Sequence, residues 1–170
     1  MSTPIRTILV VGAGPVGRRL AGWAAGAGYR TILEDLSGHW RNQLAGDPAL
    51  AGVEVGQDLE RVAGEADLIL EAAPDDFETK FEVYTLMDRA APPRCIFAPT
   101  SPAWPVAEIA SLTYRGPNVL GLWVQPAGLE VVRGPETSKR TLAAVTEVAR
   151  SLPPWNAKTS SWNGTTASGP

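Results

Sequence analysis

The 170-residue sequence contains one cysteine and one histidine, and its 15 basic and 18 acidic residues leave a net charge of only −3. A single thiol excludes an internal disulfide, and Cys95 has no metal-ligand spacing around it. It lies in an apolar, strand-like run, so we expect a buried structural thiol. Neither sign of charge forms a run long enough to follow a phosphate backbone. These absences exclude a disulfide scaffold, a metal site and a nucleic-acid partner.

Long hydrophobic runs are also missing. No apolar stretch approaches the roughly 20 residues that cross a bilayer, and residues 1–7 lack the basic region and cleavage site of a secretory signal. We therefore expect a cytoplasmic protein with no membrane partner. The 44% hydrophobic content is typical of one globular domain. We expect that domain to span residues 1–159, followed by a loose tail at 160–170.

Apolar runs alternate with helical patterns along most of the chain. The runs predict strands at 5–11, 31–33, 53–55, 67–71, 95–98, 119–124 and 129–132, and apolar residues at helical spacing predict helices at 15–27, 75–90, 106–112 and 137–152. Such alternation favours a mostly parallel sheet with right-handed crossovers. The expected fold is a single α/β domain of the Rossmann type, a doubly wound sheet with helices on both faces.

A glycine-rich turn joins the first predicted strand to the first predicted helix. Residues 12–17 are Gly-Ala-Gly-Pro-Val-Gly, the G-x-G-x-x-G spacing that binds a dinucleotide when it follows a strand and opens a helix. Gly12 permits the tight turn, Gly14 lets the backbone approach a pyrophosphate, and Gly17 lets the helix pack close to the strand. The turn therefore predicts a nucleotide site.

The residues after the turn point to the same ligand. Pro15 and Val16 open the helix, whose unpaired amides and positive dipole end form an anion site for the cofactor phosphates. Asp35 ends the next strand and would accept hydrogen bonds from the adenosine ribose while repelling the extra phosphate of NADP. NAD is the expected cofactor. Glu34 is a competing acid and Arg41 could receive a 2′-phosphate, so NADP and a Rossmann domain without nucleotide remain as alternatives.

Five segments carry a family resemblance. They are V-G-A-G-P-V-G-R at 11–18, A-D-L-I-L-E-A at 66–72, F-E-T-K-F-E-V at 77–83, I-F-A-P-T-S at 96–101 and L-E-V-V at 129–132. From about residue 5 to residue 158 the sequence resembles the NAD-binding domain of the 3-hydroxyacyl-CoA dehydrogenases, as a short and divergent member. The resemblance implies an NAD-dependent oxidoreductase and a small acyl or hydroxy-acid substrate.

The same resemblance assigns residues on the nicotinamide side. It implies that Glu71, Ala73 and Lys80 border the cofactor and that Thr100 lies in the loop lining the active cleft. Other interpretations stay open. Lys80 could form a surface ion pair with Asp76 four residues earlier, and Glu71 could simply terminate a strand.

The catalytic residues implied by the resemblance are Ser101 and Glu130. In the family a histidine takes the proton from the substrate hydroxyl as hydride leaves for NAD, and a glutamate, matched by Glu130, holds the imidazole. Trp123 occupies the position of that histidine, and an indole has no basic nitrogen that could act as general base. The hydroxyls of Thr100 and Ser101 could alternatively cap the loop before Pro102.

Two pieces of the family have no counterpart here. The segment between Asp35 and Glu71 is too short for the helical excursion with which members grip acyl-CoA, and members continue into a helical second domain beyond the position of Lys158. We expect a cleft open on one side, or covered by a homodimer or partner chain. Three functions follow: an oxidoreductase of the hydroxyacyl type, a catalytically silent NAD(H)-binding sensor or assembly subunit, and a domain that acts by protein contact alone.

Overall fold

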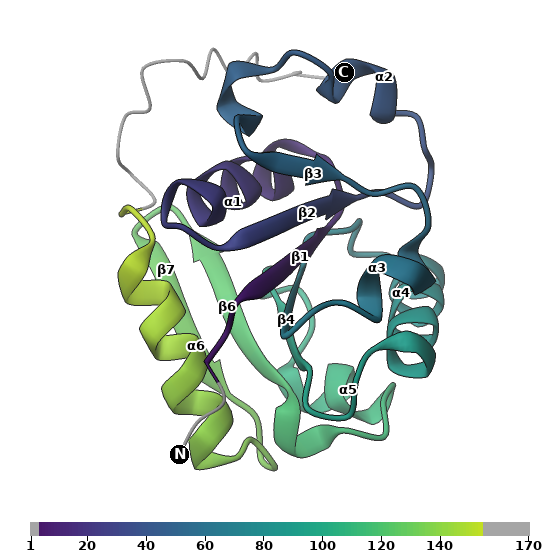
Figure 1. Ribbon diagram of the computed structural model, residues 1–170. Helices are drawn as coiled ribbons and strands as arrows, with labels where there is room; N and C mark the ends of the chain where they lie inside the picture. The colour runs from purple at the N-terminus through teal and green to yellow at the C-terminus, as the bar shows by residue number, and fades with distance from the viewer. Residues whose placement is uncertain (1–3, 155–170) are drawn as a thin grey trace.

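The computed structural model describes residues 4–154, whose centre is a sheet of five parallel strands (Figure 1). The strands are β1 (Thr7–Val11), β2 (Arg30–Glu34), β3 (Val53–Val55), β4 (Leu68–Glu71) and β5 (Ile96–Pro99), in the order β3-β2-β1-β4-β5. The chain runs outward from β1 to β3 and then crosses back to β4, so the direction of winding reverses between β1 and β4. The prediction of a doubly wound Rossmann-type sheet is confirmed. The expected boundary at residue 159 and the tail at 160–170 lie outside the described residues.

Helices cover both faces of this sheet. One face carries α1 (Pro15–Gly26) and α6 (Lys139–Ser151), and the other carries α3 (Leu59–Ala63), α4 (Phe77–Ala90) and α5 (Val106–Ser111). Figure 1 shows α6 on one side of the sheet, and α3, α4 and α5 together on the other. A short helix, α2 (Arg41–Leu44), and the 3₁₀ turn η1 (Pro48–Leu50) lie between β2 and β3, and η2 (Gly116–Asn118) follows α5.

The central strands are apolar throughout because both of their faces are covered. Ile8 and Val10 of β1 pack in the layer of α1 and α6, whereas Leu9 and Val11 pack in the layer of α3, α4 and α5. Successive strand residues point to opposite faces, so a strand buried on both sides contains no polar alternation. Cys95 is buried in the second layer, as expected.

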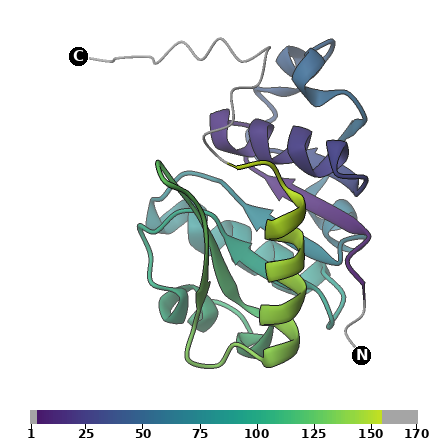
Figure 2. The same cartoon turned by 90° about the vertical axis from the view of Figure 1, so that its left-hand side faces the viewer.

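The last two strands form an antiparallel hairpin instead of extending the parallel sheet. β6 (Leu120–Gln125) and β7 (Gly128–Arg133) are a separate pair, joined to β5 by a bridge between Phe97 and Val119 and by a 2.8 Å hydrogen bond from the amide of Val124 to the carbonyl of Thr100. The pattern of apolar residues in a strand does not show which other strand it pairs with. The short connection between β6 and β7 indicates an antiparallel pair, because a parallel return needs about a dozen residues or more. Figure 2 shows α6 lying along this hairpin.

Side-chain caps explain why two helices, α4 and α6, begin later than expected. Asp76 caps α4 by accepting a hydrogen bond from the amide of Thr79, and Ser138 caps α6 by accepting from the amide of Thr141. A residue at the cap lies outside the helix, so each helix starts just after it. Neither α2 nor α3 was expected, because helices of four and five residues are too short to display a helical period.

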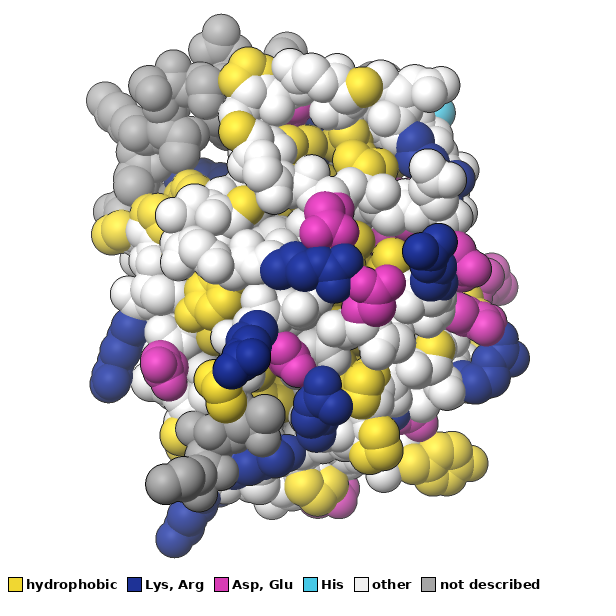
Figure 3. Space-filling model, viewed as in Figure 1, with side chains coloured by type: hydrophobic (Ala, Val, Ile, Leu, Met, Phe, Trp, Pro, Cys, Tyr) yellow, Lys and Arg dark blue, Asp and Glu magenta, His cyan; other side chains and the backbone are white. Residues whose placement is uncertain are grey.

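Charged side chains of both signs are interspersed on the face shown in Figure 3. Arg30 lies 2.8 Å from Glu54 and 2.7 Å from Glu65, so one cation contacts carboxylates from β3 and from the turn after α3. Within residues 4–154, no helix is long and apolar enough to cross a membrane. No group of three or more His, Cys, Asp or Glu side chains in that range could hold a metal ion.

Candidate functional site

The glycine turn lies at the carboxyl end of β1, beside the point where the strand order reverses. Gly12 has a φ of 105°, and a Cβ there would lie 2.5 Å from the carbonyl oxygen of Ala72. A Cβ on Gly17 would lie 1.7 Å from the carbonyl oxygen of Gly12. A Cβ on Gly14 would meet nothing within 4 Å. Packing therefore requires the first and third glycines, whereas the second faces open space where a ligand can approach the backbone.

The N-terminus of α1 leaves its amides available. Gly14 is the N-cap and makes no side-chain cap, Pro15 occupies the first turn, and that turn contains no acidic residue. The amide of Arg18 bonds to the carbonyl of Gly14 at 3.0 Å. The amides of Val16 and Gly17 precede this first helical bond and have no acceptor within the helix. Such a terminus binds an anion without a basic side chain, so the turn fits a dinucleotide pyrophosphate.

Asp35 follows β2 directly and contacts the turn. Its Oδ2 accepts a 2.9 Å hydrogen bond from the amide of Ala13, and its Oδ1 accepts from the amide and hydroxyl of Ser37 at 3.0 and 2.6 Å. Burial opposes ionisation, but these hydrogen bonds and the charge of Arg41 hold the pKa of Asp35 below its usual value. The carboxylate is therefore charged at neutral pH and lies against the backbone of the glycine turn.

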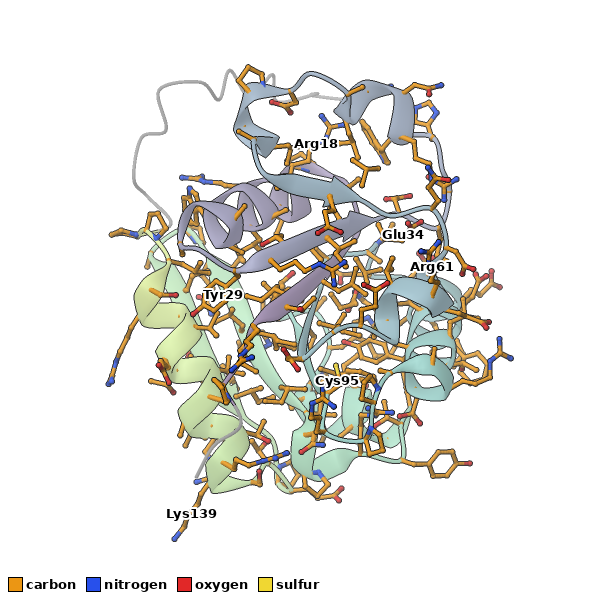
Figure 4. All side chains as sticks on the ribbon, in the orientation of Figure 1. Arg18, Tyr29, Glu34, Arg61, Cys95 and Lys139 are labelled. Atoms are coloured by element: carbon orange, nitrogen blue, oxygen red, sulfur yellow. The ribbon has the colours of Figure 1, made fainter. Side chains whose placement is uncertain are left out.

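Glu34 and Arg41, which the sequence left as alternatives for recognising the ribose, bind each other. Arg41 Nη2 lies 3.0 Å from Glu34 Oε1 and 3.1 Å from the carbonyl oxygen of Gln57. Figure 4 shows Glu34 near the carboxyl end of β2. Burial raises the pKa of Glu34, and the hydrogen bond and charge of Arg41 oppose that rise.

Arg18 and Trp40 also lie near the turn, although neither was expected there. Arg18 Nε donates a 2.8 Å hydrogen bond to the carbonyl of Ala13, and its guanidinium lies 4.6 Å from the ring centroid of Trp40. His39, whose ring centroid is 5.3 Å from that of Trp40, belongs to the same loop after β2. Arg18 could have been suspected from its place directly after the third glycine, whereas the contribution of Trp40 depends on how the loop folds back.

A buried ion pair lies at the carboxyl end of β4. Lys80 Nζ is 2.8 and 2.9 Å from the two carboxylate oxygens of Glu71, and it also donates to the carbonyl of Ala73 at 3.0 Å. The amide of Ala73 and the hydroxyl of Tyr84 donate to the same carboxylate at 2.8 and 3.1 Å. Burial raises the pKa of Glu71, and the charge of Lys80 opposes it. A surface ion pair between Lys80 and Asp76 is therefore the wrong interpretation, since Lys80 is only 2% exposed.

Asp75 connects this buried pair to the loop after β5. Its Oδ1 lies 3.1 Å from Lys80 Nζ, and its Oδ2 accepts a 2.7 Å hydrogen bond from the hydroxyl of Ser101. Trp104 Nε1 donates to the backbone carbonyl of Asp75 at 2.8 Å. Ser101 Oγ also accepts from the amide of Ala103, so the loop-capping interpretation holds as well. Asp75 was not among the expected residues, and only the fold shows that it meets the loop.

The hydroxyl of Thr100 makes a hydrogen bond inside the protein. The side chain is buried, and Oγ1 donates a 3.0 Å hydrogen bond to the backbone carbonyl of Glu71. Its amide donates to the same carbonyl at 2.9 Å. Thr100 therefore ties the ends of β4 and β5 together, with the next residue, Ser101, exposing its hydroxyl.

Trp123 and Glu130 face each other across the β6–β7 hairpin. They are paired in the register of the two strands, and Glu130 accepts a hydrogen bond from the side-chain amide of Gln125. Trp123 packs against the layer of α3, α4 and α5, and its indole N–H is buried without a hydrogen-bond partner in residues 4–154. Glu130 is thus paired with a ring that has no basic nitrogen.

The parallel strands bring these residues to one edge of the sheet. The glycine turn and Asp35 follow β1 and β2, whereas Glu71, Asp75 and Ser101 follow β4 and β5. Ligands of open α/β sheets bind at this edge, where the strand order reverses. Fold and site together define a dinucleotide-binding Rossmann domain.

The comparison with known families narrows this class. Residues 37–154 match the family described as "3-hydroxyacyl-CoA dehydrogenase, NAD binding domain", and the chain belongs to that family. The expected family and the expected cofactor, NAD, are both confirmed. The matched range contains the Glu71–Lys80 pair and the β6–β7 hairpin, and the glycine turn precedes it.

Relatives and solved structures agree with this assignment. A probable 3-hydroxybutyryl-CoA dehydrogenase of Bacillus subtilis is 30% identical over 87% of this chain, and the mitochondrial hydroxyacyl-coenzyme A dehydrogenase of Sus scrofa is 25% identical over 87%. The chain spans 60% and 57% of the lengths of these two relatives. The structure of (S)-3-hydroxybutyryl-CoA dehydrogenase from Ralstonia eutropha shares the fold, with a TM-score of 0.74 at 22% identity over 87% of this chain and 61% of that one.

Proposed function

We propose that this chain holds NAD(H) along the carboxyl edge of its sheet and is the cofactor-binding part of an oxidoreductase of the 3-hydroxyacyl type. The observation that carries the proposal is the open space at Gly14, in front of amides that have no helical acceptor. Residues proposed to hold the pyrophosphate are Gly12, Gly14, Pro15, Val16 and Gly17. Asp35 is proposed to hold the adenosine ribose.

The nicotinamide is proposed to lie over the ends of β4 and β5. Glu71, Ala73 and Lys80 form the floor there, because their polar atoms are bonded to one another and buried. Thr100 fixes the same floor through its bond to β4. The cofactor supplies a hydride acceptor or donor when bound. The chain's own contribution on this side is a rigid surface and a route for the proton.

Proton transfer needs a group other than Trp123. We propose Ser101 and Asp75, since the hydroxyl already donates to the carboxylate at 2.7 Å. A substrate hydroxyl at Ser101 Oγ would pass its proton to that oxygen while the proton of Ser101 moves to Asp75 Oδ2. The substrate proposed is a small hydroxy acid or acyl compound. Glu130 is paired with Trp123 in the hairpin, so it has no imidazole to orient.

Trp123 also favours a second candidate function, a catalytically silent NAD(H)-binding sensor or assembly subunit. A homodimer or a partner chain is proposed for either function, because Phe77 and Phe81 on α4 are 56% and 53% exposed and stack on each other. Exposed aromatic rings of this kind are typical of protein interfaces.

Two experiments test these proposals. Isothermal titration with NADH should give a dissociation constant for the wild type and clearly weaker binding for Asp35→Ala, with Glu147→Ala on the exposed face of α6 as the matched control. No heat with the wild type would overturn the proposal. Absorbance at the NADH band with a short 3-oxoacyl-CoA then separates the two candidate functions. Turnover supports the oxidoreductase, and binding without turnover supports the silent protein. Restored turnover in Trp123→His would show that only the base had been lost.

A further inference from the structure

We infer that Glu34 decides the preference for NAD over NADP by pairing with Arg41, so that the guanidinium beside the proposed ribose acid is not available to a 2′-phosphate. The inference rests on the proposed binding of a dinucleotide at the glycine turn. It assigns a specificity role to the residue before the ribose acid, whose side chain is buried and is not expected to touch the cofactor.

Arg41 contacts Glu34 through a single nitrogen of its guanidinium. Nη2 lies 3.0 Å from Glu34 Oε1 and 3.1 Å from the carbonyl oxygen of Gln57. The side chain of Arg41 is 39% exposed, whereas that of Glu34 is 1% exposed. A largely accessible guanidinium is thus anchored by a carboxylate that water does not reach.

The same guanidinium lies close to the ribose acid. Burial raises the pKa of Asp35, and the charge of Arg41 helps the hydrogen bonds from Ala13 and Ser37 to bring it below its usual value. The loop between them folds tightly over Arg41, since Gly38 has a φ of 62° and a Cβ there would lie 3.1 Å from Arg41 Nη1. An arginine beside the acid at the end of β2 is where a 2′-phosphate is accommodated in NADP-binding Rossmann domains.

Glu34 is buried and depends on Arg41 for a compensating charge. Its Oε2 is buried and has no hydrogen-bond partner within the described residues. Gly56 packs directly on that oxygen, because a Cβ at Gly56 would lie 2.3 Å from it. Arg41 is therefore the counter-charge of a desolvated carboxylate, and removing it would leave that charge uncompensated. A 2′-phosphate would have to compete with Glu34 for the guanidinium while being repelled by Asp35.

Replacing only the charge of Glu34 should release the arginine. Glu34→Gln keeps the size of the side chain and can still accept a hydrogen bond, but it no longer binds Arg41 as an ion pair. The guanidinium can then pair with a phosphate dianion, which it binds with two N–H donors. We expect the affinity for NADPH to rise about tenfold or more in this variant, while that for NADH changes by less than about threefold.

The test measures dissociation constants for NADH and NADPH in the wild type, Glu34→Gln, Glu34→Gln/Arg41→Gln and Arg41→Gln. The inference expects the gain for NADPH in the first variant and its loss in the double variant. An unchanged affinity for NADPH in Glu34→Gln, or a gain that survives in the double variant, would overturn it. Should Glu34→Gln fail to fold, Glu34→Leu takes its place, because it also removes the carboxylate that holds Arg41 and leaves no buried charge; the inference expects the same gain for NADPH, and an unchanged affinity would refute it. Absence of NADH binding to the wild type would instead refute the proposed function.

Discussion

Lys80 Nζ lies between the two carboxylate oxygens of Glu71, at 2.8 and 2.9 Å, and both side chains are almost completely buried. The pair joins α4 to the end of β4 directly below the proposed nicotinamide side of the site. A buried pair of this kind positions its neighbours, and its loss leaves one charge without a partner.

We expect Lys80→Met to lower the free energy of unfolding by about 3 to 5 kcal/mol, because Glu71 would stay buried without its cation. Urea unfolding followed by circular dichroism measures this loss. Lys139→Met is the matched control, since Lys139 is exposed at the start of α6 and Figure 4 shows it directed away from the protein. Equal stabilities for the two variants would show that the buried pair has no structural role.

Substitutions of Gly17 and Gly14 should separate an effect on folding from an effect on NADH binding. Gly17→Ala places a Cβ 1.7 Å from the carbonyl oxygen of Gly12 and is expected to cost more than about 2 kcal/mol of stability, by urea unfolding. Gly14→Ala meets no atom within 4 Å, so it should fold normally and weaken NADH binding about tenfold or more. Normal NADH affinity in Gly14→Ala would contradict a pyrophosphate at this position.

Asp75 should matter for proton transfer and not for cofactor binding. If the wild type reduces a short 3-oxoacyl-CoA, Asp75→Asn is expected to lower kcat about 100-fold, because the amide cannot pass a proton to Ser101 to replace the one that Ser101 gives to the substrate oxygen. The dissociation constant for NADH should stay within about twofold. Glu78→Gln, an exposed neighbour on α4, is the control. Wild-type turnover in Asp75→Asn would remove Asp75 from the mechanism.

Glu34 should make the free energy of unfolding depend on pH, because burial shifts its pKa. Burial raises the pKa of Glu34 above 4.5, so the folded chain keeps a proton that the unfolded chain releases. Its contribution to the free energy of unfolding is therefore fully present below 4.5 and decreases as the pH rises toward the folded-state pKa. We expect the stability of Glu34→Gln relative to the wild type to increase between about pH 4 and pH 7, in urea unfolding at fixed ionic strength.

Glu54 is a control for these pH measurements, because its pKa is shifted in the opposite direction to that of Glu34. Its hydrogen bond from Arg30 lowers the pKa of Glu54, so the stability that it contributes is present above 4.5 and is lost as the pH falls. Glu54→Gln should therefore lose stability relative to the wild type as the pH rises to about 4.5, and should show no further change between that pH and pH 7. A common trend in both variants would contradict the opposite environments of the two carboxyl groups.

The first part of the chain was predictable in unusual detail. Strand, glycine turn, helix and acid all lie within residues 7–35, and each constraint is local: a φ that suits glycine, a proline at the helix start and an acid at a strand end. The β6–β7 hairpin was less predictable, since an apolar run does not specify the direction of its partner. The sequence pattern did not predict helix α3, because its cap, Asp58, is followed by only five helical residues.

The sequence by itself determined the class of fold, the glycine turn that opens the first helix, and the absence of a basic nitrogen at Trp123, because these depend on residue type and short spacing. Only the tertiary structure decided that Lys80 is buried against Glu71 rather than paired with Asp76, that Asp75 meets Ser101, and that Glu34 holds Arg41. These partners come from different elements of the chain. Their contacts arise when parallel strands bring their carboxyl ends to one edge, and desolvation there makes each charge select a specific counter-charge.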